Sequence, residues 1–208
     1  MRKYRQIVWI LLLYLTMHLL ISHIKDHVQL DTEEAVFIAE QIPLVHFEAK
    51  TLLLKSGEIA TASFFVKSGI LRGFYTDDHL NEHVLQFACE RWWIADLYSL
   101  LTHSPANLSI EVIEKAEVYV LNQDLKETLY QKIPKLERYF RILTENALIA
   151  QQQRILFTMS LTAEERFKLF CKKYPGLIHS VPQKQIASYI GVTPEFFSKM
   201  KTKLFRAL

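Results

Sequence analysis

The sequence predicts an α+β protein in which a β jelly-roll barrel is followed by a long helix and a C-terminal helix-turn-helix domain. Three observations lead to this fold class. Short apolar runs separated by turn residues follow one another between residues 45 and 121, which is typical of an antiparallel sandwich or barrel. At about Gln123 the apolar period changes from two residues to 3.6, the period of a helix. The last fifty residues combine a helix cap, a glycine turn and a basic helix.

The composition is that of a globular protein. Half of the 208 residues are apolar and 23% are charged, which excludes a disordered chain and allows one large domain or two small ones. The two cysteines, Cys89 and Cys171, exclude a disulfide scaffold and a four-thiolate metal site, and they fit a reducing compartment. The sequence shows no catalytic triad, phosphate loop or carboxylate pair. We therefore expect neither an enzyme nor a bound cofactor or metal.

Residues 1–22 form an apolar leader of uncertain role. Arg2, Lys3 and Arg5 precede the run Ile7–Leu15, but no small-residue cleavage site follows. The nearly uninterrupted apolar stretch is shorter than the ~20 residues of a membrane span. Three alternatives stay open: a buried or partner-covered helix, an extension from a start codon placed too early, and a membrane anchor or signal.

Residues 23–133 are expected to form a sensor domain. Asp31 or Thr32 can cap a helix that ends at about Gln41, before Pro43. A turn is expected at Lys67–Gly69, where a glycine follows two polar residues. The predicted strands, read from alternation and β-branched or aromatic content, are Thr51–Leu54, Ala62–Val66, Ile70–Tyr75, Glu82–Ala88, Trp92–Ile94, Leu108–Ile113 and Glu117–Leu121.

Residues 134–159 are expected to form a dimerisation helix. A short helix, Asp124–Lys132, precedes it, and Pro134 suits its first turn. Its apolar stripe runs for some 25 residues, about 37 Å, which one small barrel cannot cover, so a symmetric partner helix is the favoured cover. The alternative is a helix that lies on its own barrel. The predicted dimer seam consists of Leu136, Phe140, Leu143, Ala147 and Ala150.

Residues 160–208 are expected to bind DNA. A helix over Thr162–Tyr174 precedes Gln183–Tyr189, a break at Gly191, a cap at Thr193 and a final helix over Pro194–Arg206. Residues 151–208 hold ten lysines and arginines against three acids, a charge of +7, whereas the first 150 residues carry −4. This asymmetry favours a polyanion as partner. The alternative is a solvated basic face.

One face of the final helix is free to read bases. Glu195, Ser198, Lys199 and Thr202 share it, at a spacing that packing against the preceding helix does not need. A lysine can bind guanine or phosphate, and a glutamate can accept a hydrogen bond from cytosine. The predicted DNA-binding residues are Gln183, Lys184, Thr193, Glu195, Ser198, Lys199, Thr202 and Lys203.

From about residue 20 to the end, the chain resembles the Crp/Fnr transcription regulators. The likeness is densest in Phe65–Arg72, Trp92–Leu97 and Val181–Leu204. The runs Glu-Arg-Trp-Trp-Ile-Ala-Asp and Pro-Gln-Lys-Gln-Ile-Ala-Ser-Tyr-Ile-Gly-Val-Thr-Pro-Glu-Phe-Phe-Ser are similar to the Bacteroidetes branch of that family. The resemblance implies a cyclic-nucleotide-binding-like barrel and a DNA-binding helix-turn-helix.

The resemblance implies a degenerate effector pocket. Where family members hold ribose with Gly-Glu-Leu, this chain has Ala95-Asp96-Leu97, and the phosphate-binding Arg-Ser pair falls on Ala106-Asn107. A buried phosphate without a cation costs several kcal/mol, so cyclic AMP is not the expected effector. Any unidentified small-molecule effector is expected to contact Trp92, Trp93, Asp96, Ala106 and Asn107.

The DNA-reading residues match the family more closely. Its Arg-Glu-x-x-x-Arg pattern falls on Pro194, Glu195 and Lys199, so one arginine is lost and the other is a lysine. Lysine lacks the bidentate guanidinium fork, so an altered half-site is expected.

The sequence therefore predicts a homodimeric, sequence-specific regulator of transcription, with double-stranded DNA, a second copy and RNA polymerase as partners. An inserted leader would carry the DNA-binding end out of the cytoplasm, so we expect a cytoplasmic protein without a membrane partner. The alternative function is a module that binds a small molecule or protein and whose basic tail does not read DNA. The sequence leaves open the effector, the operator, activation or repression, and whether residues 1–16 belong to the protein.

Overall fold

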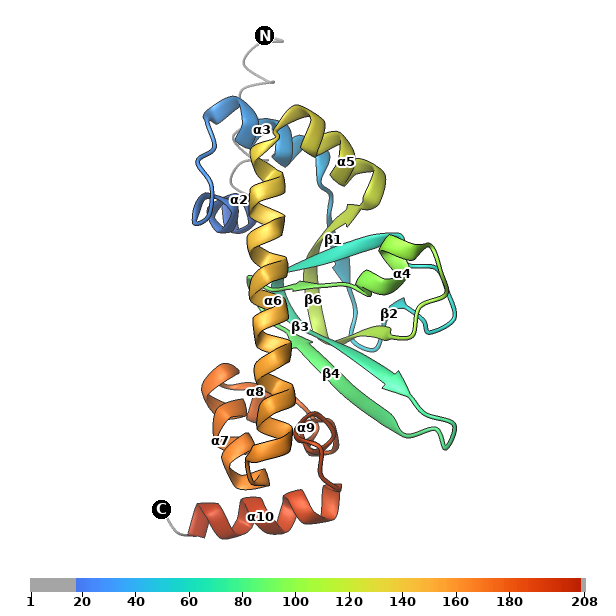
Figure 1. The fold of residues 1–208 in the computed structure, drawn as a ribbon, viewed down its shortest axis with the longest axis vertical. Helices are drawn as coiled ribbons and strands as arrows, with labels where there is room; N and C mark the ends of the chain where they lie inside the picture. The colour runs from blue at the N-terminus through green and yellow to red at the C-terminus, as the bar shows by residue number, and fades with distance from the viewer. Residues whose placement is uncertain (1–17, 207–208) are drawn as a thin grey trace.

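The computed structural model describes residues 18–206 and places a long helix, α6 (Lys135–Ser160), along the whole molecule (Figure 1). The N-terminal helices lie at one end of α6, the sheet lies beside its middle, and the C-terminal helices lie at its other end. The helices are α2 (His18–Lys25), α3 (Thr32–Gln41), α4 (Leu97–Thr102), α5 (Gln123–Lys132), α6, α7 (Ala163–Lys173), α8 (Leu177–Ser180), α9 (Gln183–Ile190) and α10 (Pro194–Arg206). The strands are β1 (Leu44–Phe47), β2 (Leu52–Leu54), β3 (Ala62–Thr76), β4 (Glu82–Ala88), β5 (Trp93–Ile94) and β6 (Ser109–Asn122).

The strands form one antiparallel sheet, which confirms the predicted α+β class. Its order is β1-β6-β3-β4, with β2 paired to β6 and β5 paired to β3. Side chains alternate between two cores: Phe64 lies in a cluster with Leu71, Ile94 and Ile110, whereas the adjacent Phe65 packs in the cluster that contains helices α2, α3 and α6. The helices at the N-terminal end and α6 thus cover the outer face of the sheet.

The predicted turn at Lys67–Gly69 is wrong, because β3 continues through it. Gly69 has φ of +88°, and the pairing of β3 with β6 changes register between Ser68 and Ile70. A Cβ atom on Gly69 would lie 2.5 Å from the carbonyl oxygen of Lys115. The glycine therefore permits a β-bulge within a long strand, and the two strands predicted around it are one. The predicted strands Leu108–Ile113 and Glu117–Leu121 likewise merge into β6.

Replacement of Gly69 by alanine is expected to destabilise the fold by about 2–4 kcal/mol, since the left-handed φ costs about 1–2 kcal/mol and the backbone clash adds to it. Gly57→Ala is the matched control: Gly57 also has a positive φ, but nothing lies within 4 Å of its Cβ position. Gly57→Ala should therefore cost only about 1 kcal/mol. Urea unfolding of both variants measures the difference, and equal losses would contradict the close approach.

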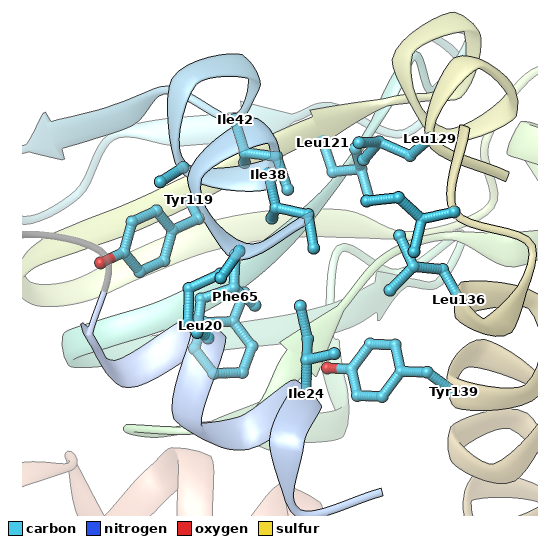
Figure 2. Packing of buried hydrophobic residues seen from close by; sticks show 14 of the residues in the cluster. Leu20, Ile24, Ile38, Ile42, Phe65, Tyr119, Leu121, Leu129, Leu136 and Tyr139 are labelled. Carbon is cyan, nitrogen blue, oxygen red and sulfur yellow. The ribbon is translucent and has the colours of Figure 1, made fainter. Parts of the chain in front are cut away.

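Helix α2 is part of the core. Leu20, Ile21 and Ile24 are buried, and Figure 2 shows Leu20 and Ile24 beside Phe65 and Tyr139. The domain boundary predicted after residue 22 falls inside this helix. No helix within residues 18–206 is long and apolar enough to cross a membrane. Residues 1–17 of the leader lie outside the described residues, so the three alternatives for this segment stay open.

His23 connects α2 to α6. His23 is half-buried, and its Nδ1 atom lies 2.7 Å from the hydroxyl oxygen of Tyr139, which also accepts a hydrogen bond from Trp93 Nε1 at 2.9 Å. Burial, with smaller contributions from His27 and Arg91, lowers the pKa of His23 to about 4. The imidazole is therefore neutral at pH 7 and ties α2 to α6.

Candidate functional site

The helix-turn-helix forms as its local signals predict. Gly191 adopts a left-handed φ of +81° and ends α9, and its N–H donates to the carbonyls of Ala187 and Ser188. The hydroxyl of Thr193 accepts a hydrogen bond from Phe196 N at 3.2 Å and caps α10. Ala187 on α9 and Phe197 on α10 are fully buried between the two helices. Small and large residues thus fix the angle between the two helices.

One side of α10 is left for a partner. Glu195, Ser198 and Lys199 are exposed, whereas Phe197 and Met200 face α9 and the core. The structure brings all eight predicted DNA-binding residues to the surface: Gln183, Lys184, Thr193, Glu195, Ser198, Lys199, Thr202 and Lys203. Besides Thr193, which caps α10, two more side chains have polar partners: Thr202 donates its hydroxyl to the Ser198 carbonyl at 3.0 Å, and Lys203 Nζ lies 3.7 Å from Glu164 Oε1.

Sequence reasoning missed Phe196. This large apolar side chain is 52% exposed in the first turn of α10, next to Glu195. Its neighbour Phe197 is buried, and two successive residues of a helix cannot share one face. Two adjacent phenylalanines in a predicted helix are therefore a sequence signal that one of the two rings is exposed. An exposed phenyl ring at this end of the helix can contact the methyl group of thymine.

The residues of the predicted dimer seam also make contacts within the chain. Leu136 is buried in the chain's own core, and Phe140 and Leu143 pack against the same cluster. Ala147 and Ala150 line a cleft within the chain. Helices α2 and α3 thus add apolar cover for Leu136, Phe140 and Leu143, whereas Ala147 and Ala150 stay exposed.

A second apolar stripe occupies the other side of α6. Each residue of an α-helix is rotated by ~100° from the one before, so the members of this stripe lie about 120–160° from Leu143, in one direction or the other around the helix axis. Its members Leu148, Ile149, Ile155, Leu156 and Met159 are between 53% and 81% exposed. They recur at the spacing of a helix–helix seam, with Gln152 between them. A row of exposed apolar side chains of this kind marks an interaction surface.

The expected effector residues divide into two groups. The Asp96 carboxylate is buried and accepts three backbone N–H groups: Oδ1 from Ser99 at 3.0 Å, and Oδ2 from Asn107 and Leu108 at 3.1 Å each. It caps α4, a helix that sequence reasoning did not foresee. Its hydrogen-bonding capacity is thus largely used within the chain.

Ala106 is bound to the loop that precedes β3. Its N–H donates to the Glu58 carbonyl and its carbonyl accepts from Gly57, both at 2.8 Å. Asn107 is exposed beside it. Trp92 and Trp93 lie elsewhere, in the wall of the cleft beside α6. The structure therefore separates the predicted effector residues rather than joining them in one pocket.

The chain matches a known domain family and curated relatives. The family described as cyclic nucleotide-binding domain matches residues 44–132. The anaerobic regulatory protein of Haemophilus influenzae is 22% identical over 160 residues, which are 72% of this chain and 62% of that protein. The match thus spans less than two thirds of this relative's length.

Solved structures share the fold. The c-di-GMP responsive global regulator CLP of Xanthomonas campestris is 13% identical, with a TM-score of 0.68 over 85% of this chain and 93% of its own. A transcriptional regulator from Eubacterium rectale that is assigned to the Crp/Fnr family is 15% identical, with a TM-score of 0.65 over 86% and 84% of the two chains. At these identities the structural likeness shows the fold. The Bacteroidetes branch stays a prediction.

Proposed function

We propose that the chain is a homodimeric regulator of the Crp/Fnr type that binds a specific DNA sequence, because the Crp/Fnr-like proteins that it resembles are DNA-binding transcription factors and typically dimers. The observation that carries the proposal is the free face of α10, on which Glu195, Ser198 and Lys199 stand exposed on a capped and well-packed helix. A helix of this kind places its N-terminal side chains in the major groove.

A second copy of the chain is the proposed cover of the exposed stripe on α6. Two such stripes packed against each other would bury Leu148, Ile155 and Met159 in a symmetric helix pair. The same symmetry would place two copies of α10 for the two halves of a palindromic site. The dimer thus supplies both the stability and the geometry that a DNA reader needs.

RNA polymerase is the further partner that we propose, because a regulator of transcription acts through it. The competing function is a binding module whose basic C-terminal residues only aid solubility. The two differ in sequence preference, since a solvated basic surface binds all duplexes alike. The homologues are regulators, and we propose that this chain likewise has no enzymatic activity.

Lys199→Ala is expected to weaken binding to the preferred site by about 1–3 kcal/mol and to relax the preference at one base pair in each half-site. Lys203→Ala is the matched control on the same helix, because Lys203 lies near Glu164 on α7 and is expected to contact phosphate only. It should weaken binding to all sequences to a similar, small degree. Selection of binding sites from random duplexes measures the base preference of both variants, and titration with DNA measures their affinity. An unchanged base preference in Lys199→Ala would contradict the role assigned to Lys199.

Cyclic AMP is expected to leave the DNA affinity unchanged. The position at which relatives of this type hold a phosphate carries Ala106 and Asn107, which offer no cation, and Asp96 is bound to backbone donors. Calorimetry with the full chain measures this directly. Micromolar binding of cyclic AMP, or a shift in DNA affinity at millimolar nucleotide, would contradict a degenerate pocket.

A further inference from the structure

A cleft runs along α6 between the sheet and the C-terminal helices. It consists of two adjoining hollows of about 380 Å³ and 230 Å³, which share Ala150, Arg154, Lys173 and Tyr189 in their walls. The larger hollow also reaches His23 on α2 and Trp93 on β5. Walls therefore come from the N-terminal helix, the sheet, α6 and the helix-turn-helix domain at once.

The charge of the larger hollow is one-sided. Its lining includes the cations Arg91, Arg154 and Lys173, and no aspartate or glutamate among the described residues lines it. Arg91 is paired with Asp26 at the edge. Arg154 and Lys173 have no carboxylate partner within the described part of the chain. Two cations in a shared wall thus lack a counter-charge.

Arg154 is held in place without being neutralised. Its Nη2 atom donates to the carbonyls of Val84 and Tyr189 at 3.1 Å each, and its Nη1 atom donates to the carbonyl of Leu85. Its guanidinium also lies 4.3 Å from the centre of the Tyr189 ring. These contacts fix the group between the sheet and α9 and leave its positive charge uncompensated, as a preformed anion-binding group requires.

Apolar and aromatic side chains also line the cleft, beside the polar Gln86, Asn146, Gln151, Gln153 and Thr158 and the cation Arg166. Lys173 Nζ lies 5.3 Å from the centre of the Trp92 ring, and Trp92 packs on Tyr174 with ring centres 5.4 Å apart. The smaller hollow is lined by Phe157, Leu169 and Phe170. An occupant of such walls needs an apolar body as well as an anionic group.

We propose that this cleft is a binding site for a small organic anion with an aromatic or aliphatic body, whose acidic group pairs with Arg154 and Lys173. The site is distinct from the position of Asp96, Ala106 and Asn107, none of which lines it. Because its walls join the sheet to α7 and α9, an occupant would contact both the sensor and the DNA-binding domain. That regulatory role rests on the proposed function, whereas the binding itself does not.

Titration of the full chain with the fluorescent anion 8-anilinonaphthalene-1-sulfonate tests the site. We expect saturable binding of one molecule per chain, and Lys173→Met should weaken it about fivefold, the effect of one exposed ion pair. Lys172→Met is the matched control, since Lys172 is the adjacent exposed residue and lines neither hollow. It should bind the probe as the unaltered chain does.

The neutral analogue N-phenyl-1-naphthylamine separates charge from apolar attraction. Its affinity should be the same in Lys173→Met and in the unaltered chain, because it carries no acidic group. No saturable binding of the anion, or equal losses in the two lysine variants, would overturn the proposal. DNA is absent from these titrations, so a chain that binds the probe but no specific DNA would refute the proposed function and leave this site standing.

Discussion

Ile155→Asp is expected to convert the proposed dimer into monomers. Ile155 is 61% exposed in the single chain and lies within the stripe that a second α6 would cover. A carboxylate buried twice in a symmetric seam has no partner, so the dimer dissociation constant should rise at least a hundredfold, for a loss of about 3 kcal/mol or more. Sedimentation equilibrium measures the change, and specific DNA affinity should fall with it.

Ala147→Asp is the control for the face of the helix. Ala147 belongs to the stripe that the sequence favours as the seam, yet it lines the cleft on the opposite side of α6. Its replacement should leave the mass of the dimer unchanged. A dimer that survives Ile155→Asp, or that dissociates with Ala147→Asp instead, would contradict the seam proposed here.

Removal of residues 1–26 is expected to unfold the sensor domain at room temperature. The deletion takes away Leu20, Ile21 and Ile24, which are 0–3% exposed. Loss of one such side chain costs about 2–5 kcal/mol, and three together match the whole stability of a typical domain, ~5–15 kcal/mol. Thermal unfolding followed by circular dichroism measures the outcome.

Removal of residues 1–16 alone is the comparison. Helix α2 begins at His18, so this shorter deletion keeps every contact described above and should keep a cooperative transition. Equal stability of the two truncated chains would show that α2 contributes little to the core, against the packing of Leu20 and Ile24 in Figure 2.

The features that the sequence predicts correctly depend on local interactions. Helix α7 begins where Thr162 and Glu165 form a reciprocal capping box, and α3 begins at the same kind of box on Asp31. Gly191 ends α9 because glycine, which lacks a Cβ atom, adopts the left-handed backbone conformation there without strain. Such signals need only a few neighbouring residues, so the helix-turn-helix and its exposed face follow from the sequence.

The features that the sequence misses depend on distant neighbours. Gly69 reads as a turn residue until Lys115 on β6 is placed against it. Helix α6 carries two apolar stripes, and only the packing of α2 and α3 decides which one is internal. Asp96 resembles a ligand-binding carboxylate until the N–H groups of Asn107 and Leu108 meet it. Arg154 likewise has a role only once three carbonyls from two domains converge on it.

Selection of binding sites from random DNA duplexes by the full chain tests the central claim most directly. A dimeric reader should enrich an inverted repeat with half-sites about 10–11 base pairs apart, centre to centre, and its affinity for that repeat should fall steeply with salt yet exceed that for unrelated duplexes throughout. Failure to enrich any sequence, with equal salt-dependent binding to all duplexes, would contradict a sequence-specific regulator.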